Sequence, residues 1–326
     1  MLFEFSALIF FLILLGKSAD LVVDHVSNLS KYFKISSLAV GFLLVALTTS
    51  LPELTISVLS STASEGEIAA GNVFGSNIAN ILLILGIGSL FYGVKISAED
   101  QKEIRLVLIS TSSLTILILL GSSLLNYSLS LFDGLLLLLF FVLYCIYSLK
   151  KKFSDDLEKQ FNLTKKQAAF SFVFFFIGIF LVLISSSFVV HFSVSLAKTA
   201  HLSESFIGST FVAVGTSLPE LSTTIAALRK KEYSLALGDS IGSNLVNLTL
   251  VLGSAATINP ISILVLPIFT LVLVFALLSD FLLFIFSSFF PYLGKFVGVV
   301  FLIFYLLYLF LLFNFQFSSL TDLVFL

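Results

Sequence analysis

Long apolar segments follow one another along the chain, separated by short stretches that contain charged residues, Gly or Pro. About 20 apolar residues in a helix span the hydrocarbon core of a bilayer. The hydropathy pattern therefore predicts an all-α membrane protein with ten transmembrane helices. The predicted spans lie at residues 2–24, 36–62, 67–92, 104–122, 127–149, 168–195, 203–228, 234–256, 262–287 and 294–315.

One polar connection is much longer than the others, and it divides the predicted helices into two sets of five. Its sequence is KKKFSDDLEKQFNLTKKQ, residues 150–167. We interpret it as a cytoplasmic linker between a first five-helix repeat, residues 1–149, and a second five-helix repeat, residues 168–326.

The positions of the basic residues predict the orientation of the chain. With ten spans, the loops after the odd-numbered helices carry fifteen Lys and Arg residues, and the opposite side carries Lys198 alone. Cytoplasmic loops are enriched in Lys and Arg. We therefore expect an integral protein of the plasma (inner) membrane with both termini outside the cytoplasm. The amino terminus lacks a basic leader and a cleavage site, which indicates a retained first helix.

Composition supports the same class. The chain is 58% hydrophobic and 11% charged, with a mean hydropathy of +1.13, whereas soluble domains are about 25% charged. A net charge of −2 offers no field for nucleic acid. With Cys145 as its single cysteine, the chain has no internal disulfide. The lipid bilayer is the expected surrounding, and the oligomeric state does not follow from the sequence.

Two segments recur at a constant offset of 167 residues and without a gap. GFLLVALTTSLPEL at 41–54 matches GSTFVAVGTSLPEL at 208–221, and GNVFGSNIANILLILG at 71–86 matches GDSIGSNLVNLTLVLG at 238–253. Hydrophobic composition alone would not align polar residues over such a length. The two segments therefore indicate an internal duplication.

The loops after the first segment of each copy carry opposite charge. Glu65 and Glu67 follow the first copy, whereas Arg229, Lys230 and Lys231 follow the second. Loops of opposite charge are expected on opposite sides of the membrane, so the repeats are predicted to be inverted. Inverted repeats with Gly/Pro-interrupted helices are typical of secondary transporters, which work by alternating access.

The TSLPE motif provides oxygen atoms inside the predicted membrane. Its proline lacks an N–H and kinks the helix, which frees carbonyls near Thr48 and Gly215. Glu53 and Glu220 have no nearby Lys or Arg within their spans, and a buried carboxylate needs a cation or a proton. We expect the two carboxylates to meet near the midplane in an oxygen cage that suits Ca²⁺ and accepts Na⁺.

A second polar element accompanies this motif. Gly75-Ser76-Asn77 and Gly242-Ser243-Asn244 are each followed by an asparagine, Asn80 or Asn247, one turn further on. A polar stripe on an apolar helix faces protein or water. The alternative interpretation is that these small and polar residues only hold helices together. Two copies, each with a glutamate that has no Lys or Arg close to it in the sequence of its span, favour an ion site.

Other polar residues within the predicted spans receive structural interpretations. We expect Lys17 and Asp20, three positions apart, to neutralise each other. Asp133 and Asp280 have no repeat partner and are interpreted as structural hydrogen-bonding groups. Asp239, which occupies the position of Asn72 in the other copy, is interpreted as a helix cap.

The paired GTSLPE-like and GNxxGSN-like elements resemble the α-repeats of the calcium/cation antiporter superfamily, in its prokaryotic sodium/calcium exchanger branch. The resemblance covers essentially the whole chain. It implies that Glu53 and Glu220 are the central ligands of Ca²⁺ and Na⁺. It also implies that helices 1 and 6 slide across the other eight. The further ligands that it implies are Thr49, Ser50, Ser76, Asn80, Thr216, Ser217, Ser243 and Asn247, with the carbonyls of Ala46 and Ala213.

Two positions depart from the family pattern. Thr48 stands where the family usually has the glycine that Gly215 retains, so packing or ligand number in the first copy is expected to differ. Asn247 stands where some relatives have aspartate. The site is therefore expected to hold two carboxylates rather than three, which argues against a potassium site.

The sequence thus predicts a secondary antiporter that exchanges Ca²⁺ for Na⁺, with both ions as substrates, and not an enzyme with a resident cofactor. Ca²⁺/H⁺ antiport is the alternative, with Glu53 and Glu220 protonated in one half-cycle. A channel is a further possibility, although inverted, broken helices favour alternating access. A membrane-embedded hydrolase using Ser50 or Ser217 is a remote alternative, because no GxSxG or HExxH context is present.

Overall fold

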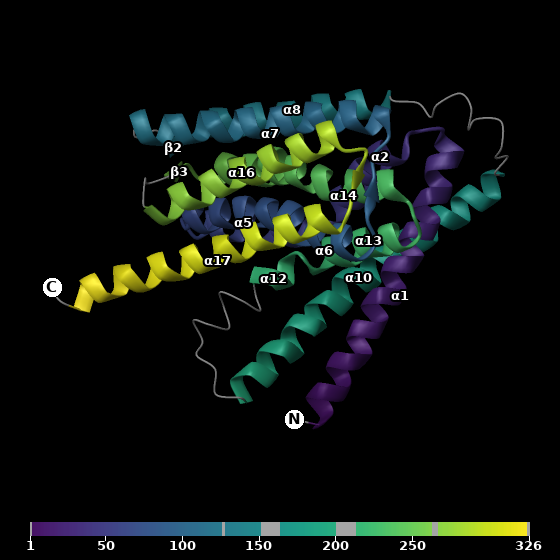
Figure 1. Cartoon of the computed structure of the whole chain (residues 1–326), viewed down its shortest axis with the longest axis horizontal. Coiled ribbons are helices and arrows are strands. Elements are labelled where there is room, and N and C mark those ends of the chain that lie inside the picture. The colour runs from purple at the N-terminus through teal and green to yellow at the C-terminus, as the bar shows by residue number, and fades with distance from the viewer. Residues whose placement is uncertain (1, 126–127, 151–163, 200–212, 263–266, 325–326) are drawn as a thin grey trace. The chain divides into compact units, whose positions relative to one another are not determined.

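The computed structural model describes residues 2–125, 128–150, 164–199, 213–262 and 267–324, and most of these residues are helical (Figure 1). The first half contains α1 (Leu2–Phe33), α2 (Ser37–Val40), η1 (Gly41–Ala46), α3 (Leu47–Thr49), α4 (Leu51–Thr62), α5 (Gly66–Ile78), η2 (Ala79–Leu85), α6 (Gly86–Phe91), α7 (Ala98–Leu125) and α8 (Leu131–Leu149). The second half contains α10 (Lys165–Thr199), α12 (Ala213–Thr216), α13 (Leu218–Arg229), α14 (Tyr233–Val246), η4 (Asn247–Val251), α15 (Leu252–Ile258), α16 (Pro267–Phe289) and α17 (Lys295–Val324).

Eight helical segments within the described ranges are long and apolar enough to cross a membrane, and a bent pair of helices makes a ninth. These nine match nine of the ten predicted spans, with shifted ends. The first helix, for example, continues to Phe33 rather than ending near residue 24. The remaining predicted span, 203–228, begins outside the described residues, so the count of ten stays a prediction.

The predicted linker lies largely outside the described residues, which include its last part, residues 164–167. Thr164 accepts a hydrogen bond from the backbone N–H of Gln167, and the Gln167 side chain accepts from the Thr164 N–H. This reciprocal capping starts α10 at Lys165, three residues earlier than the predicted helix.

The helix that carries the first TSLPE motif is broken, as the proline predicts, but the break precedes the proline. The two parts, Ser37–Thr49 and Leu51–Thr62, meet at 48°. Ser50 at the break has φ −79° and ψ 9°, and Ser217 in the other copy has φ −89° and ψ 5°. Both serines therefore leave helical geometry in the same way, and the preceding turns lose regular carbonyl partners.

The offset of 167 residues seen in the sequence reappears in local structure. α4 and α13 begin and end at equivalent residues, and α5 and α14 begin at equivalent residues. The turns that follow contain Ser64 with φ 63° and Lys231 with φ 64°, again 167 residues apart. The duplicated segments thus have the same local conformation.

Two short antiparallel strand pairs were not predicted from the sequence. β1 (Val94–Lys95) pairs with β4 (Tyr292–Leu293), and β2 (Ser128–Leu129) pairs with β3 (Ile261–Ser262). Each pair joins a connection of the first half to one of the second half. Strands of two residues leave no detectable alternation in a sequence of long apolar runs.

The chain forms two compact units, each drawn from both halves of the sequence. The first unit contains residues 1–52 and 144–243, and the second contains residues 53–143 and 244–326. This division by packing differs from the division by repeat, and the predicted repeat boundaries stay predictions.

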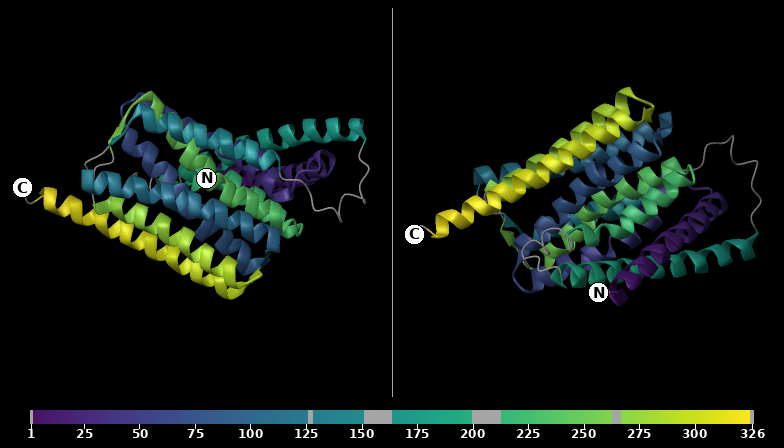
Figure 2. Two further views of the ribbon diagram at one scale, coloured as in Figure 1. Left: turned by 90° about the horizontal axis from the view of Figure 1, so that it is seen from above. Right: turned by 60° about the horizontal axis from the view of Figure 1, so that its bottom comes forward.

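In the first unit, α1 and α10 lie side by side along much of their length (Figures 1 and 2). Their contact is aromatic: Phe11 stacks on Phe188 with ring centroids 4.4 Å apart, and Phe192 follows at 5.8 Å. Near the middle of α10, Gly178 lets the helix approach Val22, where a Cβ atom would lie 2.9 Å from a Val22 methyl group. Large rings and one glycine thus set the spacing of this helix pair.

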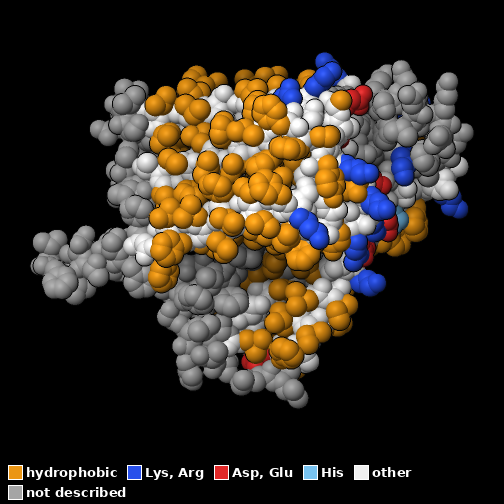
Figure 3. All heavy atoms as spheres, in the orientation of Figure 1, with side chains coloured by type: hydrophobic (Ala, Val, Ile, Leu, Met, Phe, Trp, Pro, Cys, Tyr) orange, Lys and Arg blue, Asp and Glu red, His pale blue; other side chains and the backbone are white. Residues whose placement is uncertain are grey.

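In the second unit, α17 packs against α6, η2 and α16, and α16 packs against α5 and α7. Both views in Figure 2 show α16 and α17 running together. Figure 3 shows hydrophobic side chains across the face that these helices present. Leu106 and Ile109 of α7, Phe281 of α16, and Leu306 and Phe310 of α17 are all exposed. An exposed face of this composition is suited to lipid.

A close backbone contact at Gly238 holds the middle of α14 against Leu38 in the first unit. A Cβ atom on Gly238 would lie 2.2 Å from the carbonyl oxygen of Leu38, whereas a Cβ atom on the equivalent Gly71 would meet nothing within 4 Å. The two glycines therefore have different roles despite their equivalent positions in the repeat.

We expect Gly238→Ala to lower the free energy of unfolding by about 1–3 kcal/mol, because backbone atoms must move to admit the methyl group. Gly71→Ala is the matched control. It should leave stability unchanged or raise it by up to about 1 kcal/mol, since alanine favours a helix. Thermal unfolding of the detergent-purified proteins measures both. Equal losses in the two variants would contradict the assigned contact.

Candidate cation site

Glu53 lies in the first turn of α4, immediately after the break at Ser50, and its side chain is 1% exposed. The Ser76 hydroxyl of α5 lies 3.4 Å from Glu53 Oε1 and donates to it. Asn72 Nδ2 donates to the Glu53 carbonyl oxygen at 3.2 Å and to Ser57 Oγ at 3.1 Å. The broken helix and α5 together thus hold this carboxylate inside the second unit.

The carboxylate of Glu53 is only partly satisfied. Within the described ranges, Oε2 has no hydrogen-bond partner, and no Lys, Arg or His forms an ion pair with this residue. A buried carboxylate without a compensating charge is costly. A cation or a proton would remove that cost.

Glu220 holds the equivalent position in α13, after the break at Ser217, and is also 1% exposed. Ser50 Oγ donates to Glu220 Oε1 at 3.4 Å, so the serine at the first break reaches the glutamate of the second copy inside the first unit. Ser217 and Ser243 are buried in the same unit, and their hydroxyl oxygens have no hydrogen-bond partner among the described residues. The predicted serines therefore leave oxygen atoms available to a cation.

Four asparagines form a closed network between α5 and the end of α14 in the second unit. Asn77 Nδ2 donates to the Asn244 carbonyl, and Asn244 Nδ2 donates to the Asn77 carbonyl, both at 3.2 Å. Asn80 Nδ2 donates to Asn244 Oδ1 at 3.0 Å, and Asn247 Nδ2 donates to Asn77 Oδ1 at 3.1 Å. Each hydrogen bond made by a residue of the first copy has a counterpart made by the equivalent residue of the second copy. The network therefore has local two-fold symmetry.

The network also orients Asn80 and Asn247. With their amide nitrogens engaged, the oxygens Oδ1 of both residues are buried without a partner in the described part of the chain. Asn80 is the second residue of the π-helical segment η2, and Asn247 is the first residue of the π-helical segment η4. Single π-helical turns often mark functional sites, because the extra residue interrupts the regular backbone ladder.

The remaining predicted ligands have mixed surroundings. The Ala46 carbonyl accepts the Ser50 N–H at 3.1 Å, and the Thr49 hydroxyl lies 3.4 Å from the same oxygen. Thr49 is fully buried, and its hydroxyl bonds the Val45 carbonyl at 3.1 Å. Ala213 and Thr216 begin and end α12, and Thr216 is partly buried. The ligand roles of all twelve residues, and the sharing of one cage by Glu53 and Glu220, stay predictions.

The structure corrects two interpretations of charged residues. Asp20 pairs with Arg229 and with Lys230 Nζ at 3.8 Å, rather than being neutralised by Lys17 alone. Lys230 also contacts Asp24 at 2.7 Å. The error came from weighing only neighbours along one helix, whereas the turn after α13 folds back onto α1.

Asp239 is not a helix cap, because it lies in the middle of α14 and is 1% exposed. Sequence reasoning missed its burial, although one signal was present: it is the only acidic residue inside the second GxxxGSN element. In contrast, Asp280 accepts hydrogen bonds from Thr111 at 2.6 Å and Ser112 at 3.0 Å, which confirms its interpretation as a hydrogen-bonding group. Asp133 likewise accepts from the N–H and hydroxyl of Ser130.

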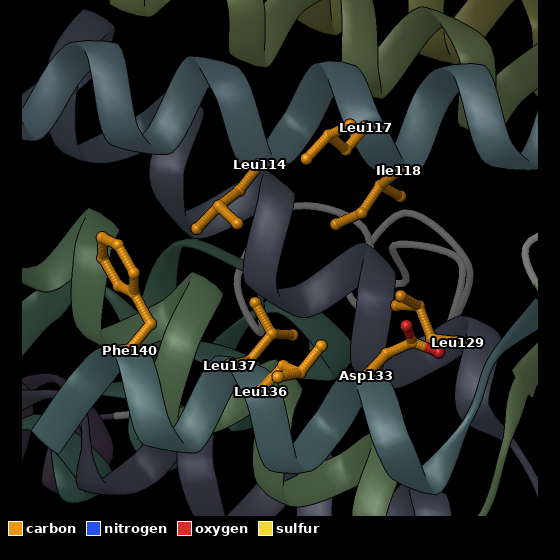
Figure 4. A pocket seen from close by; sticks show the side chains of 8 residues that line it. All are labelled: Leu114, Leu117, Ile118, Leu129, Asp133, Leu136, Leu137 and Phe140. Carbon is orange, nitrogen blue, oxygen red and sulfur yellow. The ribbon is translucent and has the colours of Figure 1, made fainter. Parts of the chain in front are cut away.

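One well-formed cavity, of about 290 Å³, lies between α7 and α8 of the second unit (Figure 4). Its lining is apolar except for Asp133, and it contains none of the predicted ligands. The lining residues are Leu114, Leu117, Ile118, Leu129, Asp133, Leu136, Leu137 and Phe140. Asp133 accepts hydrogen bonds from Ser130 through Oδ2, so it already has a structural role at the edge of this cavity.

Comparisons with known proteins agree with this arrangement. The chain matches the family described as sodium/calcium exchanger protein over residues 3–150 and 170–314. It is 35% identical over 270 residues to inner membrane protein YrbG of Escherichia coli, covering 80% of this chain and 81% of YrbG. It is 29% identical to sodium/calcium exchanger MaX1 of Methanosarcina acetivorans, covering 95% of this chain and 98% of MaX1.

A solved structure shares the fold. The sodium-calcium exchanger NCX_Mj, soaked with 10 mM Na⁺ and zero Ca²⁺, superposes with a TM-score of 0.81 at 27% identity, covering 93% of this chain and 97% of NCX_Mj. The paired glutamates, the buried oxygens and these matches lead to one assignment. The chain is a membrane-embedded cation antiporter, and it belongs to the sodium/calcium exchanger protein family, within the calcium/cation antiporter superfamily.

Proposed function

We propose that this antiporter exchanges Ca²⁺ for Na⁺ by alternating access, with Glu53 and Glu220 as its central ligands. The observation that carries the proposal is a pair of glutamates at equivalent helix breaks, each 1% exposed and each accepting a hydrogen bond from a serine hydroxyl at 3.4 Å. Carboxylate, hydroxyl, amide and carbonyl oxygens are the ligands that Ca²⁺ prefers. Na⁺ can occupy the same hard-oxygen positions, so the two ions compete.

The coupling follows from charge. A buried carboxylate without a bound cation is costly in free energy. The protein therefore switches between the two sides of the membrane more readily when a cation is bound to the glutamates. The remaining predicted ligands would supply neutral oxygens around the two carboxylates. They are Thr49, Ser50, Ser76, Asn80, Thr216, Ser217, Ser243 and Asn247, with the carbonyls of Ala46 and Ala213.

Transport in proteoliposomes tests the proposal. Vesicles loaded with Na⁺ and diluted into Na⁺-free buffer should take up radioactive Ca²⁺, whereas K⁺-loaded vesicles should not. Uptake driven by an acidic interior and indifferent to Na⁺ would instead establish Ca²⁺/H⁺ antiport. Single-channel currents carried by Ca²⁺ would indicate a channel and contradict alternating access.

We also propose that the two repeats are inverted and that both termini lie outside the cytoplasm. Support comes from the first unit, where Arg229 and Lys230 contact Asp20 and Asp24 of α1. Basic residues after α13 therefore lie beside the carboxyl-terminal half of α1, which the positive-inside rule also assigns to the cytoplasm.

Accessibility of one matched pair of residues tests the inversion. Ser64 and Lys231 are exposed, have nearly the same φ, and are equivalent in the repeat. In a Cys145→Ala background, we expect Ser64→Cys to react with an impermeant maleimide applied outside intact cells. Lys231→Cys should react only after the membrane is permeabilised. Labelling of both from the same side would contradict inversion.

A further inference from the structure

A buried acid that the predicted site does not include, Asp239, lies one helix away from Glu220 in the first unit. Asp239 Oδ2 accepts hydrogen bonds from Thr223 Oγ1 at 2.6 Å and Thr224 Oγ1 at 2.9 Å, and the Thr49 hydroxyl also bonds this carboxylate. The shorter distance is in the range of charge-assisted O–H···O⁻ bonds. The other oxygen, Oδ1, is buried and has no hydrogen-bond partner among the residues that the structure describes.

The position of this carboxylate follows from the helix it touches. Thr223 and Thr224 follow Glu220 by three and four residues, so they lie on the same face of α13, one turn away. One turn of helix rises about 5.4 Å. Thr49 is itself one of the predicted ligands. Asp239 is therefore held against the same surface that carries Glu220.

The two copies of the repeat differ at this point. Asn72, the equivalent of Asp239, donates its amide hydrogens to the Glu53 carbonyl and to Ser57. An ionised carboxylate has no hydrogen to donate. In the second copy the direction is reversed: the hydroxyl groups of Thr223 and Thr224 donate to Asp239, which has no hydrogen to offer to the Glu220 carbonyl. The substitution thus replaces a neutral donor with a charged acceptor.

No cationic side chain balances this charge within the described ranges, where the ion pairs of the first unit join Asp20 and Asp24 to Arg229 and Lys230. A buried carboxylate surrounded only by hydroxyl groups is poorly compensated, because hydroxyls supply partial charge alone. A nearby transported cation would supply the missing charge.

We propose that Asp239 is a specificity-determining residue, a third carboxylate whose charge raises the preference of the cation site for divalent over monovalent ions. The inference rests on the proposed function, because it assigns Asp239 to the same site. It also revises the expectation of two carboxylates: Asn247 supplies no charge, and Asp239, two turns earlier in the same helix, supplies one.

Coulomb's law gives this role a distinctive consequence. The attraction between a carboxylate and a cation is proportional to the charge of the cation, so it is twice as large for Ca²⁺ as for Na⁺ at one position. Removing the carboxylate therefore lowers the affinity for both ions, and the fold-loss of affinity for Ca²⁺ is about the square of the fold-loss for one Na⁺. A threefold loss for Na⁺, for example, corresponds to about a tenfold loss for Ca²⁺.

The test compares wild-type protein with Asp239→Asn, which keeps the shape and one acceptor oxygen, and with Asp239→Glu, which keeps the charge. Binding is measured as the concentration of CaCl₂ or of NaCl that gives half-maximal thermal stabilisation of the purified protein, which requires no transport. We expect Asp239→Asn to raise the Ca²⁺ value about tenfold and the Na⁺ value about threefold. Asp239→Glu should retain the wild-type ratio.

If Asp239→Asn raised the half-maximal concentrations of CaCl₂ and NaCl by the same factor, or changed neither, the inference would be overturned. Asp239 would then be only a structural hydrogen-bond acceptor. If Asp239→Asn does not fold, Asp239→Ser removes the same charge, and the same squared relation is expected. Na⁺-driven Ca²⁺ uptake is measured in parallel with wild-type protein. Absence of that uptake would overturn the proposed function, whereas the ratio of the binding constants decides the role of Asp239.

Discussion

Glu53→Gln and Glu220→Gln should each abolish Na⁺-driven Ca²⁺ uptake, with a loss of at least about 100-fold in rate at a fixed Ca²⁺ concentration. Replacing a metal-site partner outside the first coordination shell already costs about 10–100-fold, and these residues are proposed as direct ligands. Both side chains are 1% exposed, so neither variant gains compensation from solvent.

Radioactive Ca²⁺ uptake into Na⁺-loaded proteoliposomes measures this effect. Glu67→Gln is the control, because Glu67 is an exposed acid near the start of α5 and should transport at the wild-type rate. Glutamine has nearly the same volume as glutamate, so folding should be retained. Uptake above a tenth of the wild-type rate in either variant would contradict a central role for that carboxylate.

The second large effect concerns the asparagine network. Asn77→Leu should lower the free energy of unfolding by about 2–6 kcal/mol, because the Asn244 carbonyl and the Asn247 amide both lose a buried partner, at about 1–3 kcal/mol each. Asn244→Leu removes the equivalent bonds to Asn77 and Asn80. The local two-fold relation therefore predicts nearly equal losses in the two variants.

Thermal unfolding of the purified proteins provides the measurement, and Asn259→Leu provides the control. Asn259 is partly buried and bonds Ser64 Oγ at 3.1 Å near the surface, so we expect a loss below about 1 kcal/mol. A large loss in one of the two network variants and none in the other would show that the network does not act symmetrically.

Much of the fold could be predicted because lipid imposes a simple rule. Long apolar runs must be helical in a bilayer, and nine of the spans so predicted have helical counterparts in the described residues. The proline of TSLPE predicted a broken helix with freed carbonyls near Thr48, and the break occurs at Ser50, between Thr48 and Pro52. Backbone strain created by proline spreads over the preceding turn, so sequence places such a break only approximately.

The parts that sequence missed depend on contacts between distant residues. Asp20 pairs with Arg229 and Lys230 across 209 and 210 positions, and no local pattern indicates this. Asp239 looked like a cap because Asn and Asp favour helix ends. Its actual partners, Thr223 and Thr224, belong to another helix and become neighbours only when α13 and α14 pack.

The internal repeat was the most informative feature of the sequence, because it predicted pairs of residues with related roles. Asn77 and Asn244 illustrate this: their reciprocal bonds require the symmetry that the 167-residue offset implies. The repeat also identifies where symmetry ends. Asn72 and Asp239 occupy equivalent positions, but Asn72 donates hydrogen bonds whereas Asp239 accepts them. The sequence shows the difference in residue type, and only the structure shows the difference in hydrogen bonding.

The central claim is that Ca²⁺ and Na⁺ compete for carboxylates at Glu53 and Glu220. Calorimetric titration of Ca²⁺ into the purified protein, repeated at increasing NaCl with the ionic strength held constant by choline chloride, tests it most directly. We expect the apparent Ca²⁺ affinity to fall steadily as Na⁺ rises, and Ca²⁺ binding to be lost in Glu53→Gln and Glu220→Gln. An affinity independent of Na⁺, or unchanged binding in both variants, would contradict the account.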